Sequence, residues 1–216
     1  MCEDESVVKI VNKFNEGNVD FHQTVADMAN ISRTQAKTIN LGLFYGMGKG
    51  KLQAELGVTK DKAAELFNTY HSRVPFVKQL MDKASNRAQD RGQIRTLLGR
   101  LCRFHLWEPN SFGMHKAMTH EDALREHGPG IRRAYTYKAL NKLIQGSAAD
   151  MTKKAMLELY KEGIIPHIQI HDELDISVQD ESHANKIIEV MENAVTLEVP
   201  NKVDYEHGDN WGDIHG

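Results

Sequence analysis

The spacing of apolar residues changes partway along the chain, and this change constrains the fold more than any other feature. In the first part, apolar side chains recur at helical spacing. Later, two segments show the alternation typical of strands, one around Gly99-Arg100 and one over residues 166–178 around an acidic turn. The two periods predict an α+β protein, with helices first and β-hairpins combined with helices afterwards.

The same pattern sets the bounds of the expected elements. Ser32 and Gln35 have the spacing of a capping box, which favours a helix start there, and Gly46, Gly48 and Gly50 are expected to break that helix. Residues 107–130 are expected to be mostly loop with a short helix. Helices are predicted over 7–14, from residue 20, and over 32–45, 59–70, 75–88, 135–161 and 182–197. Residues 93–98 and 102–106 are expected to form a hairpin or an extended segment with a tight turn, and residues 202–207 a closing strand.

Four side chains spaced by four residues form one stripe on the helix predicted over 32–45: Arg33, Lys37, Leu41 and Tyr45. Arginine and lysine bind phosphate oxygens, while an apolar and an aromatic residue beyond them suit a sugar and a base. The pattern therefore fits a nucleoside triphosphate. A solvated basic face on an amphipathic helix is the alternative that the spacing leaves open.

The acidic turn His171-Asp172-Glu173 lies between the alternating apolar segments of 166–178. Carboxylates at such a turn suit Mg²⁺, which prefers oxygen ligands and often takes only one or two protein carboxylates. A plain solvent-exposed turn is the alternative, because aspartate is common in turns.

Residues 32–47 resemble the fingers-helix signature of family A DNA polymerases, Arg-x3-Lys-x3-(Phe/Tyr)-x3-Tyr-Gly. Asp20-Phe-His22 with Ala26 resembles the Asp-x-His-x3-Ala segment that precedes it, and residues 169–174 resemble the palm motif Val-His-Asp-Glu. The resemblance implies an incomplete right-hand polymerase fold of phage type, with fingers over 1–130 and the C-terminal part of the palm over 131–216. It implies template-directed addition of dNTPs to a primer.

The resemblance also implies roles for the stripe. Arg33 would contact the outer phosphates of the incoming dNTP, and Lys37 would neutralise them and protonate the departing pyrophosphate. Tyr45 would stack at the nascent pair, and His22 would lie near the phosphates. Leu41 departs from the family's Phe or Tyr. We expect it to keep apolar contact with the sugar and to discriminate against dideoxynucleotides.

In the palm motif, Asp172 would bridge two Mg²⁺ ions, Glu173 would be an auxiliary carboxylate near the primer end, and His171 would contact the primer backbone. The C-terminal segment resembles a phage-type tail whose histidine, here His215, is a weaker site candidate.

Two further motifs resemble DNA-contacting segments of the family. Asn141 and Gln145, in Asn-x3-Gln-Gly-x-Ala-Ala-Asp, would touch the minor groove, whose acceptors are common to correct pairs. Thr96, Arg100 and Arg103 would contact a DNA backbone. Close helix packing explains the small residues after Gln145, and a solvated basic turn remains an alternative for the arginines.

The family's first palm motif, Asp-Tyr-Ser-x2-Glu, is absent from the sequence. Its aspartate is the second metal ligand of the family, so we expect the isolated chain to be nearly inactive. We expect it to work with a separate polypeptide that carries this motif and the thumb, as in a split polymerase gene; a sequence truncated from a longer polymerase, or a gene whose start is misassigned, is an equal alternative. A non-catalytic remnant that binds nucleotide or DNA is the alternative.

The composition bears on nucleic-acid binding, on the cellular setting and on metal binding. The net charge of −3 argues mildly against indiscriminate nucleic-acid binding. Two cysteines and an acidic start without an apolar core predict a reduced, cytoplasmic setting, with no secretory signal and no membrane association. A zinc site remains a minor alternative for the cluster formed by Cys102, His105, His115, His120 and His127, although its spacing is irregular.

Overall fold

A computed structural model describes residues 8, 11, 12, 15, 20, 22, 23, 26, 27, 31–44, 47–73, 75–111, 113 and 115–214. The chain divides into two compact units, Met1–Ile144 and Gln145–Gly216, and the boundary falls inside one long helix. Each unit is described here by itself. The helices predicted over 7–14 and from residue 20 lie mostly outside the described residues.

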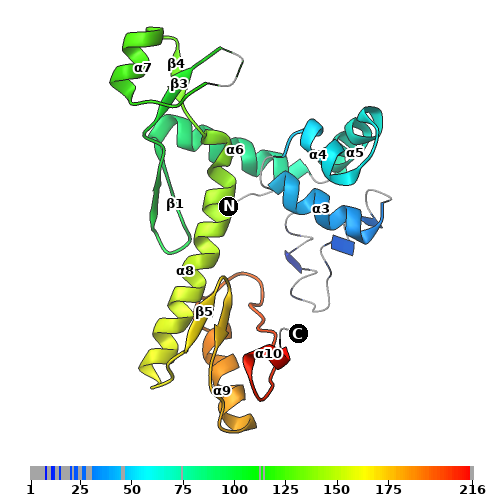
Figure 1. Cartoon of the computed structure of the whole chain (residues 1–216), viewed down its shortest axis with the longest axis vertical. Coiled ribbons are helices and arrows are strands. Elements are labelled where there is room, and N and C mark those ends of the chain that lie inside the picture. Colours follow the sequence, from blue (N-terminus) through cyan, green and yellow to red (C-terminus); the bar gives the residue numbers. More distant parts are fainter. Residues whose placement is uncertain are drawn as a thin grey trace. The chain divides into compact units, whose positions relative to one another are not determined.

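Helices α3 to α6 follow one another along the first unit (Figure 1). They span Arg33–Phe44, Lys49–Leu56, Lys60–Arg73 and Pro75–Arg91. Each contributes apolar side chains to one buried cluster, which includes Ile39, Leu43, Leu52, Leu66, Tyr70 and Val77. Burying a side chain of this size contributes roughly 1.5–3 kcal/mol. The amphipathic pattern in the sequence therefore supplies the core of these helices.

The start of α3 confirms the predicted capping box. The backbone amide of Gln35 donates to the Ser32 hydroxyl at 3.2 Å, and the Ser32 amide donates to the Gln35 side-chain oxygen at 3.2 Å. These reciprocal bonds satisfy backbone donors that have no partner inside the helix. The first turn of α3, which carries Arg33, is therefore fixed locally.

Helix α3 ends at Phe44, ahead of the glycines that were predicted to break it, and a further helix that the sequence did not predict begins among them. Gly48 takes the N-cap position of α4, and Gly50 lies inside that helix. Leu52, which is fully buried, anchors α4 in the cluster, and α4 packs on α5. Gly57 ends the helix in the left-handed conformation (φ 61°). Tertiary packing thus outweighs the weak helix propensity of glycine.

The first unit continues with two antiparallel strand pairs. Strands β1 (Gln93–Arg95) and β2 (Leu101–Arg103) form the hairpin predicted around Gly99-Arg100, with Ile94 opposite Cys102. Strands β3 (Trp107–Pro109) and β4 (Ile131–Arg133) pair with Glu108 opposite Arg132. A 3-10 turn, η1 (Thr136–Lys138), then leads into α8 (Ala139–Lys161).

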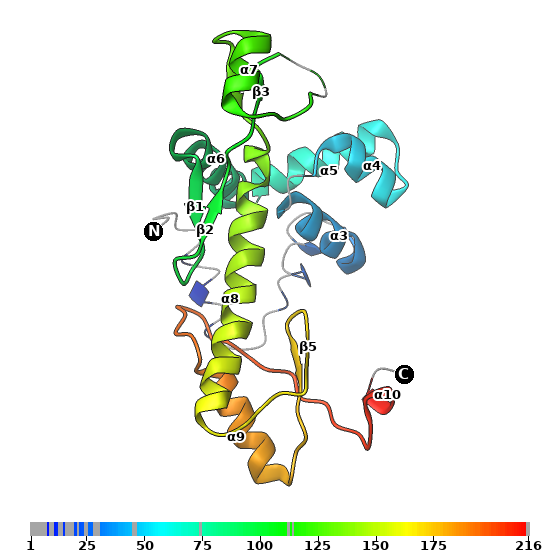
Figure 2. The ribbon, with the colours of Figure 1, turned by 60° about the vertical axis from the view of Figure 1, so that its left-hand side comes forward.

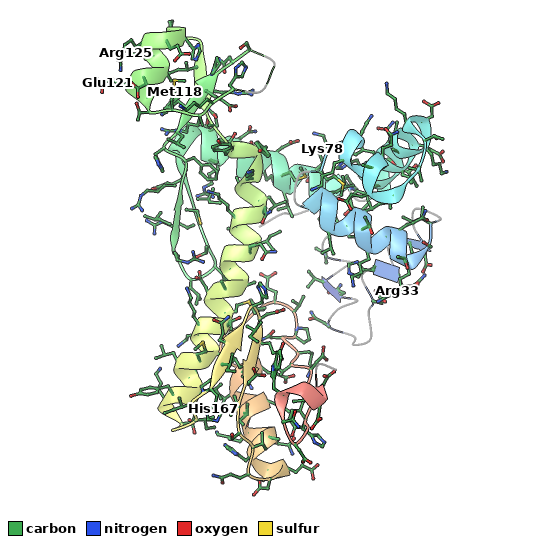
Figure 3. All side chains as sticks on the ribbon, in the orientation of Figure 1. Arg33, Lys78, Met118, Glu121, Arg125 and His167 are labelled. Carbon is green, nitrogen blue, oxygen red and sulfur yellow. The ribbon has the colours of Figure 1, made fainter. Side chains whose placement is uncertain are left out.

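The segment over 107–130 is more ordered than the sequence indicated. The expected short helix is α7 (His120–His127), capped by the Thr119 side chain. Strand β3 was not expected, because its partner β4 lies more than twenty residues away and no local alternation announces the pair. Arg125 and Glu121 lie on α7, as Figure 3 shows.

Arg133 ties the β3–β4 pair to the rest of the first unit. Its guanidinium donates to the carbonyl oxygens of Phe104 at 2.9 Å and Gln89 at 3.1 Å, and it lies over the Trp107 ring with 4.6 Å to the centroid. Gly92, at φ 66°, makes room: a β-carbon there would lie 2.7 Å from the Arg133 guanidinium carbon. These contacts join segments that are distant in sequence.

The second unit contains the C-terminal part of α8, a hairpin and α9 (Figure 2). Strands β5 (Ile168–Ile170) and β6 (Glu173–Asp175) pair with Ile170 opposite Glu173. Helix α9 covers Glu181–Glu192, five residues shorter at its end than predicted, and α10 covers Trp211–Ile214.

The closing strand predicted over 202–207 does not form. This segment is held by side chains instead, since the Val203 amide donates to the Glu192 carboxylate at 3.2 Å and the Asn201 amide group donates to the Met191 carbonyl at 3.4 Å. A strand needs a partner edge, and none of the described residues pairs with this segment. Otherwise the α+β prediction is confirmed: the protein is mostly helical with small antiparallel hairpins.

Candidate functional site

Helix α3 has one buried face and one exposed face. Ala36, Ile39 and Leu43 are buried at helical spacing in the first unit's core. Arg33, Lys37 and Leu41 are exposed, with Leu41 at 43%. The three side chains follow each other at intervals of four and so share one side of the helix. The described part of the predicted stripe is therefore a surface that a ligand can reach, whereas Tyr45 lies outside the described residues.

Arg33, at the first turn of α3 (Figure 3), pairs with Asp20 across a separation of thirteen residues. The guanidinium Nε donates to one carboxylate oxygen of Asp20, and the backbone amide of Gln23 donates to the other at 3.0 Å. The hydrogen bond from Arg33 is the main cause that lowers the pKa of the Asp20 carboxyl below its ordinary value, and the hydrogen bond from the Gln23 amide is the second. Asp20 thus links the segment ahead of α3 to the cationic end of the stripe.

His22 is placed beside α3 by a second contact. Its Nδ1 lies 3.1 Å from the side-chain nitrogen of Asn40, which is 1% exposed. Asn40 follows Arg33 by seven residues, two helical turns along nearly the same side. The structure therefore brings His22 to the helix that carries Arg33 and Lys37.

Lys37 is exposed, and none of the described residues forms an ion pair with it. A lysine with a mobile, solvated ammonium can reach an anionic ligand without first breaking a bond within the chain. Arg33 differs in this respect, because an anion must share its guanidinium with Asp20 or displace that carboxylate.

In the second unit, the acidic turn is a two-residue hairpin loop made by His171 and Asp172, and Glu173 begins β6. The turn is thus one residue earlier than the Asp172-Glu173 turn that we expected. His171 has φ 55°, which two-residue hairpin loops require at their first position and which non-glycine residues seldom adopt. Gln169 braces the loop by donating to the His171 carbonyl at 2.5 Å.

Asp172 and Glu173 are both exposed, so their carboxylates can face a ligand. Carboxylate oxygens at an exposed turn fit a hard divalent cation, and Mg²⁺ commonly completes its shell with water and substrate phosphates. Within the described part of the chain, no group of three or more His, Cys, Asp or Glu side chains could hold a metal ion. The donor chemistry of this turn fits Mg²⁺, but the ligand set it offers is partial.

The β1–β2 hairpin presents its arginines to solvent. Arg100 and Arg103 are exposed, whereas Thr96 is 5% exposed and serves the turn: its hydroxyl accepts from the Arg100 amide at 3.0 Å. Arg95 donates to the Gly99 carbonyl at 2.9 Å and braces the same turn. Thr96 therefore shapes the loop that presents Arg100 and cannot itself offer a large contact surface.

Asn141 and Gln145 lie one helical turn apart on α8, with Asn141 half-buried and Gln145 exposed. His215 lies outside the described residues.

The histidines considered as zinc ligands have other contacts. His120 packs edge-on against the Trp107 ring at 4.5 Å between centroids, and His115 Nε2 lies 3.0 Å from the Ser111 carbonyl oxygen. Among the described residues, these histidines and Cys102 do not form a group of three or more side chains that could hold a metal ion. Throughout the described ranges, no helix combines the length and apolarity that crossing a membrane demands.

The exposed cations of α3 suit phosphate groups, and the exposed carboxylates of the β5–β6 hairpin suit a hard divalent cation. Comparison with known proteins identifies the family. The model of DNA polymerase family A matches residues 1–213, and the chain belongs to this family.

Two relatives illustrate the similarity. The chain is 33% identical to a DNA-directed DNA polymerase of Pseudomonas phage M6 over an alignment 246 positions long, which covers 98% of the chain and 34% of the relative. It is 36% identical to DNA polymerase I of Geobacillus stearothermophilus over 202 residues, covering 89% of the chain and 21% of the relative. The chain thus spans between a fifth and about a third of the length of these relatives.

The fold is similar to a solved polymerase domain. The POL domain of Pol1 from M. smegmatis, in complex with DNA primer-template and dNTP, matches with a TM-score of 0.73 and 26% identity. The match covers 95% of this chain and 36% of that domain's chain. The chain therefore has the fold of part of a family A polymerase domain, as the sequence predicted.

Sequence reasoning left two residues of this site without a role. Asp20 was part of the quoted Asp-x-His pattern, and Asn40 lay inside the quoted fingers signature, yet only the structure shows that they contact Arg33 and His22. No local pattern in the sequence announces either contact, because the partners lie thirteen and eighteen positions apart.

Proposed function

We propose that these residues are the nucleotide-gripping and metal-holding part of a template-directed DNA polymerase, which adds dNTPs to a primer 3′-OH. The observation that carries this proposal is the exposed stripe of α3, with two cations and then an apolar side chain in line. A triphosphate is the ligand that needs both cations, and the adjoining sugar suits the apolar residue.

In this proposal Arg33 and Lys37 bind the phosphates of the dNTP, and Lys37 donates a proton to the departing pyrophosphate. The exposure of Lys37, and the lack of an ion pair with any described residue, support the second role, because its ammonium can follow the leaving group. Leu41 contacts the sugar and Tyr45 stacks at the base pair. His22 donates to a phosphate oxygen.

Asp172 would hold Mg²⁺, with Glu173 as an auxiliary carboxylate and His171 against the primer backbone. When bound, two Mg²⁺ ions would make the primer 3′-OH a better nucleophile and neutralise the leaving group. The support from this chain is chemical: both carboxylates are exposed, Asp172 on a braced two-residue turn and Glu173 at the start of β6.

Asp172 and Glu173 alone offer a partial ligand set for Mg²⁺, and the sequence holds no Asp-Tyr-Ser-x2-Glu motif. We propose that the second bridging aspartate comes from residues outside these 216, on a longer form of the chain or on a separate polypeptide that also supplies the thumb. Primer-template DNA would lie against Asn141, Gln145 and the turn shaped by Thr96 that presents Arg100, with Arg103 beside it.

A primer-extension assay tests this function. The purified chain is incubated with primer-template, dNTPs and Mg²⁺, alone and after addition of a polypeptide that carries the first palm motif and the thumb. We expect almost no extension by the chain alone and Mg²⁺-dependent extension by the mixture. Asp172→Asn should abolish extension, while Asp180→Asn, a change at the N-cap of α9, should leave it within about twofold.

Two outcomes would count against the proposal. Robust extension by the chain alone would refute the need for an outside carboxylate. Failure of the mixture, together with dNTP binding that survives Asp172→Asn, would favour the second candidate, a remnant that binds nucleotide without catalysis.

A further inference from the structure

Asn40 lies at the border between the two faces of α3. It follows Ala36, a core residue, by four positions, and it follows Arg33, at the exposed end of the stripe, by seven. Its side chain is 1% exposed, although its helix neighbours on the inner side are apolar. A buried amide at such a border is costly unless it makes a specific hydrogen bond.

The bond that Asn40 makes determines where the His22 ring carries its proton. The Asn40 side-chain nitrogen is only a donor, so at 3.1 Å from Nδ1 it requires that Nδ1 accept. A neutral imidazole that accepts at Nδ1 carries its proton on Nε2. Nε2 is then the donor of the ring.

The opposite orientation of the Asn40 amide is less favourable. In the present one, Oδ1 is buried and has no hydrogen-bond partner among the residues that the structure describes. Rotating the amide by half a turn would give Oδ1 a partner only if Nδ1 were protonated, and it would leave a buried NH₂ group with two donors in place of one acceptor. Buried donors without partners are rarer in proteins than under-satisfied carbonyl oxygens.

Asp20 holds the same segment from its other end. Its carboxylate accepts from the backbone amide of Gln23 at 3.0 Å, one residue beyond His22, and it also pairs with Arg33. Asp20 therefore ties the chain next to His22 to α3, while Asn40 contacts the His22 ring. Both contacts lead to α3.

We propose that Asn40 is a positioning residue that keeps His22 in the Nε2–H tautomer, so that the ring donates a hydrogen bond to a phosphate oxygen of the dNTP. The proposal rests on the proposed function for its ligand, but the tautomer itself can be measured without any nucleotide. A ring with its proton on Nδ1 would turn a lone pair toward the phosphate and weaken binding.

The first test is the tautomer. Long-range ¹H–¹⁵N correlation spectra of the labelled 216-residue chain distinguish the two forms, and the spectrum of His22→Gln identifies the His22 signals among the eleven histidines. We expect Nε2–H in the wild type. In Asn40→Asp, the ionised carboxylate accepts from the ring and should shift the proton to Nδ1, as a carboxylate does for a catalytic histidine.

The second test is a double-mutant cycle on binding of dATP. Asn40→Asp should weaken dATP binding about tenfold, which is the value of one hydrogen bond to a charged group. In the His22→Gln background the ring is gone, so Asn40→Asp should change affinity by no more than about threefold, the share caused by its added charge. Backbone amide spectra of each variant check that the fold is retained.

An Nδ1–H wild type would overturn the inference, even if Asn40→Asp failed to fold. Equal effects of Asn40→Asp in both backgrounds would overturn it as well. A failure of the proposed function would give a different result. The wild-type chain would then bind no dATP, but His22 would still carry its proton on Nε2 in the wild type and on Nδ1 in Asn40→Asp.

Discussion

Replacing Arg133 by methionine should destabilise the first unit by about 2–4 kcal/mol. Its guanidinium makes two hydrogen bonds to carbonyl oxygens, at 2.9 and 3.1 Å, and lies over the Trp107 ring. A hydrogen bond from a charged donor contributes roughly 1.5–3 kcal/mol, and an exposed cation–π contact roughly 0.5–1 kcal/mol. Methionine keeps the packing of the stem and the freed carbonyl groups are partly rehydrated, so the net loss is smaller than the sum.

Urea unfolding followed by Trp107 fluorescence, in a Trp211→Phe background, measures this loss. With a slope near 2 kcal/mol/M, the midpoint of Arg133→Met should fall by roughly 1–2 M. Arg132→Met is the matched control: it lies on the same strand, but its pair with Glu108 involves an arginine side chain that is 49% exposed, so we expect a loss below about 1 kcal/mol.

A substitution at Gly92 provides a second test of the contacts made by Arg133. Gly92→Ala would place a methyl group against the Arg133 guanidinium and also strain the backbone at φ 66°. In the Arg133→Met background only the strain remains, so the two substitutions should cost less together than their separate effects predict. Strict additivity, or an Arg132→Met loss as large as that of Arg133→Met, would refute the role assigned to Arg133.

Three further predictions follow from other residues. Leu41→Tyr in the assembled enzyme should raise incorporation of dideoxynucleotides relative to dNTPs, and an unchanged ratio in a primer-extension assay would contradict the proposed sugar contact. Burial lowers the pKa of His71 below 6.5, and the nearby positive charge of Lys78 lowers it further. The unfolded chain therefore binds more protons than the folded chain, so stability should fall as the pH drops from about 6.5 toward the folded pKa. Thermal melts recorded across that range should lose this dependence in His71→Phe. Ser32→Ala removes the cap of α3 and should cost about 1 kcal/mol in urea unfolding, whereas Ser72→Ala, at the last turn of α5, should cost less.

The sequence predicted the elements that are stabilised by interactions between residues close together in the chain. The cap formed by Ser32 and Gln35 and the hairpin around Gly99 were predicted because the necessary partners lie within a few residues. The exposed stripe of α3 was predicted for a similar reason, since a four-residue spacing fixes a helix face whatever the tertiary structure.

The features that the sequence did not predict depend on distant partners. Helix α4 forms despite Gly50 because Leu52 is buried among helices that follow it. Strand β3 needs β4 as its partner, and the segment over 202–207 stays irregular because it is tied to the end of α9 by side chains. The contact between Asn40 and His22 joins residues eighteen positions apart, so no pattern in either segment announces it.

The central claim, that the exposed face of α3 grips the triphosphate of a dNTP, is tested most directly by titrating the chain with dATP and dAMP. The account predicts that dATP binds at least about tenfold more tightly than dAMP, and that Arg33→Ala and Lys37→Ala each remove most of that preference. Lys60→Ala, an exposed lysine at the start of α5, should leave it unchanged. Equal binding of dATP and dAMP, or a preference that survives Arg33→Ala and Lys37→Ala, would contradict the account.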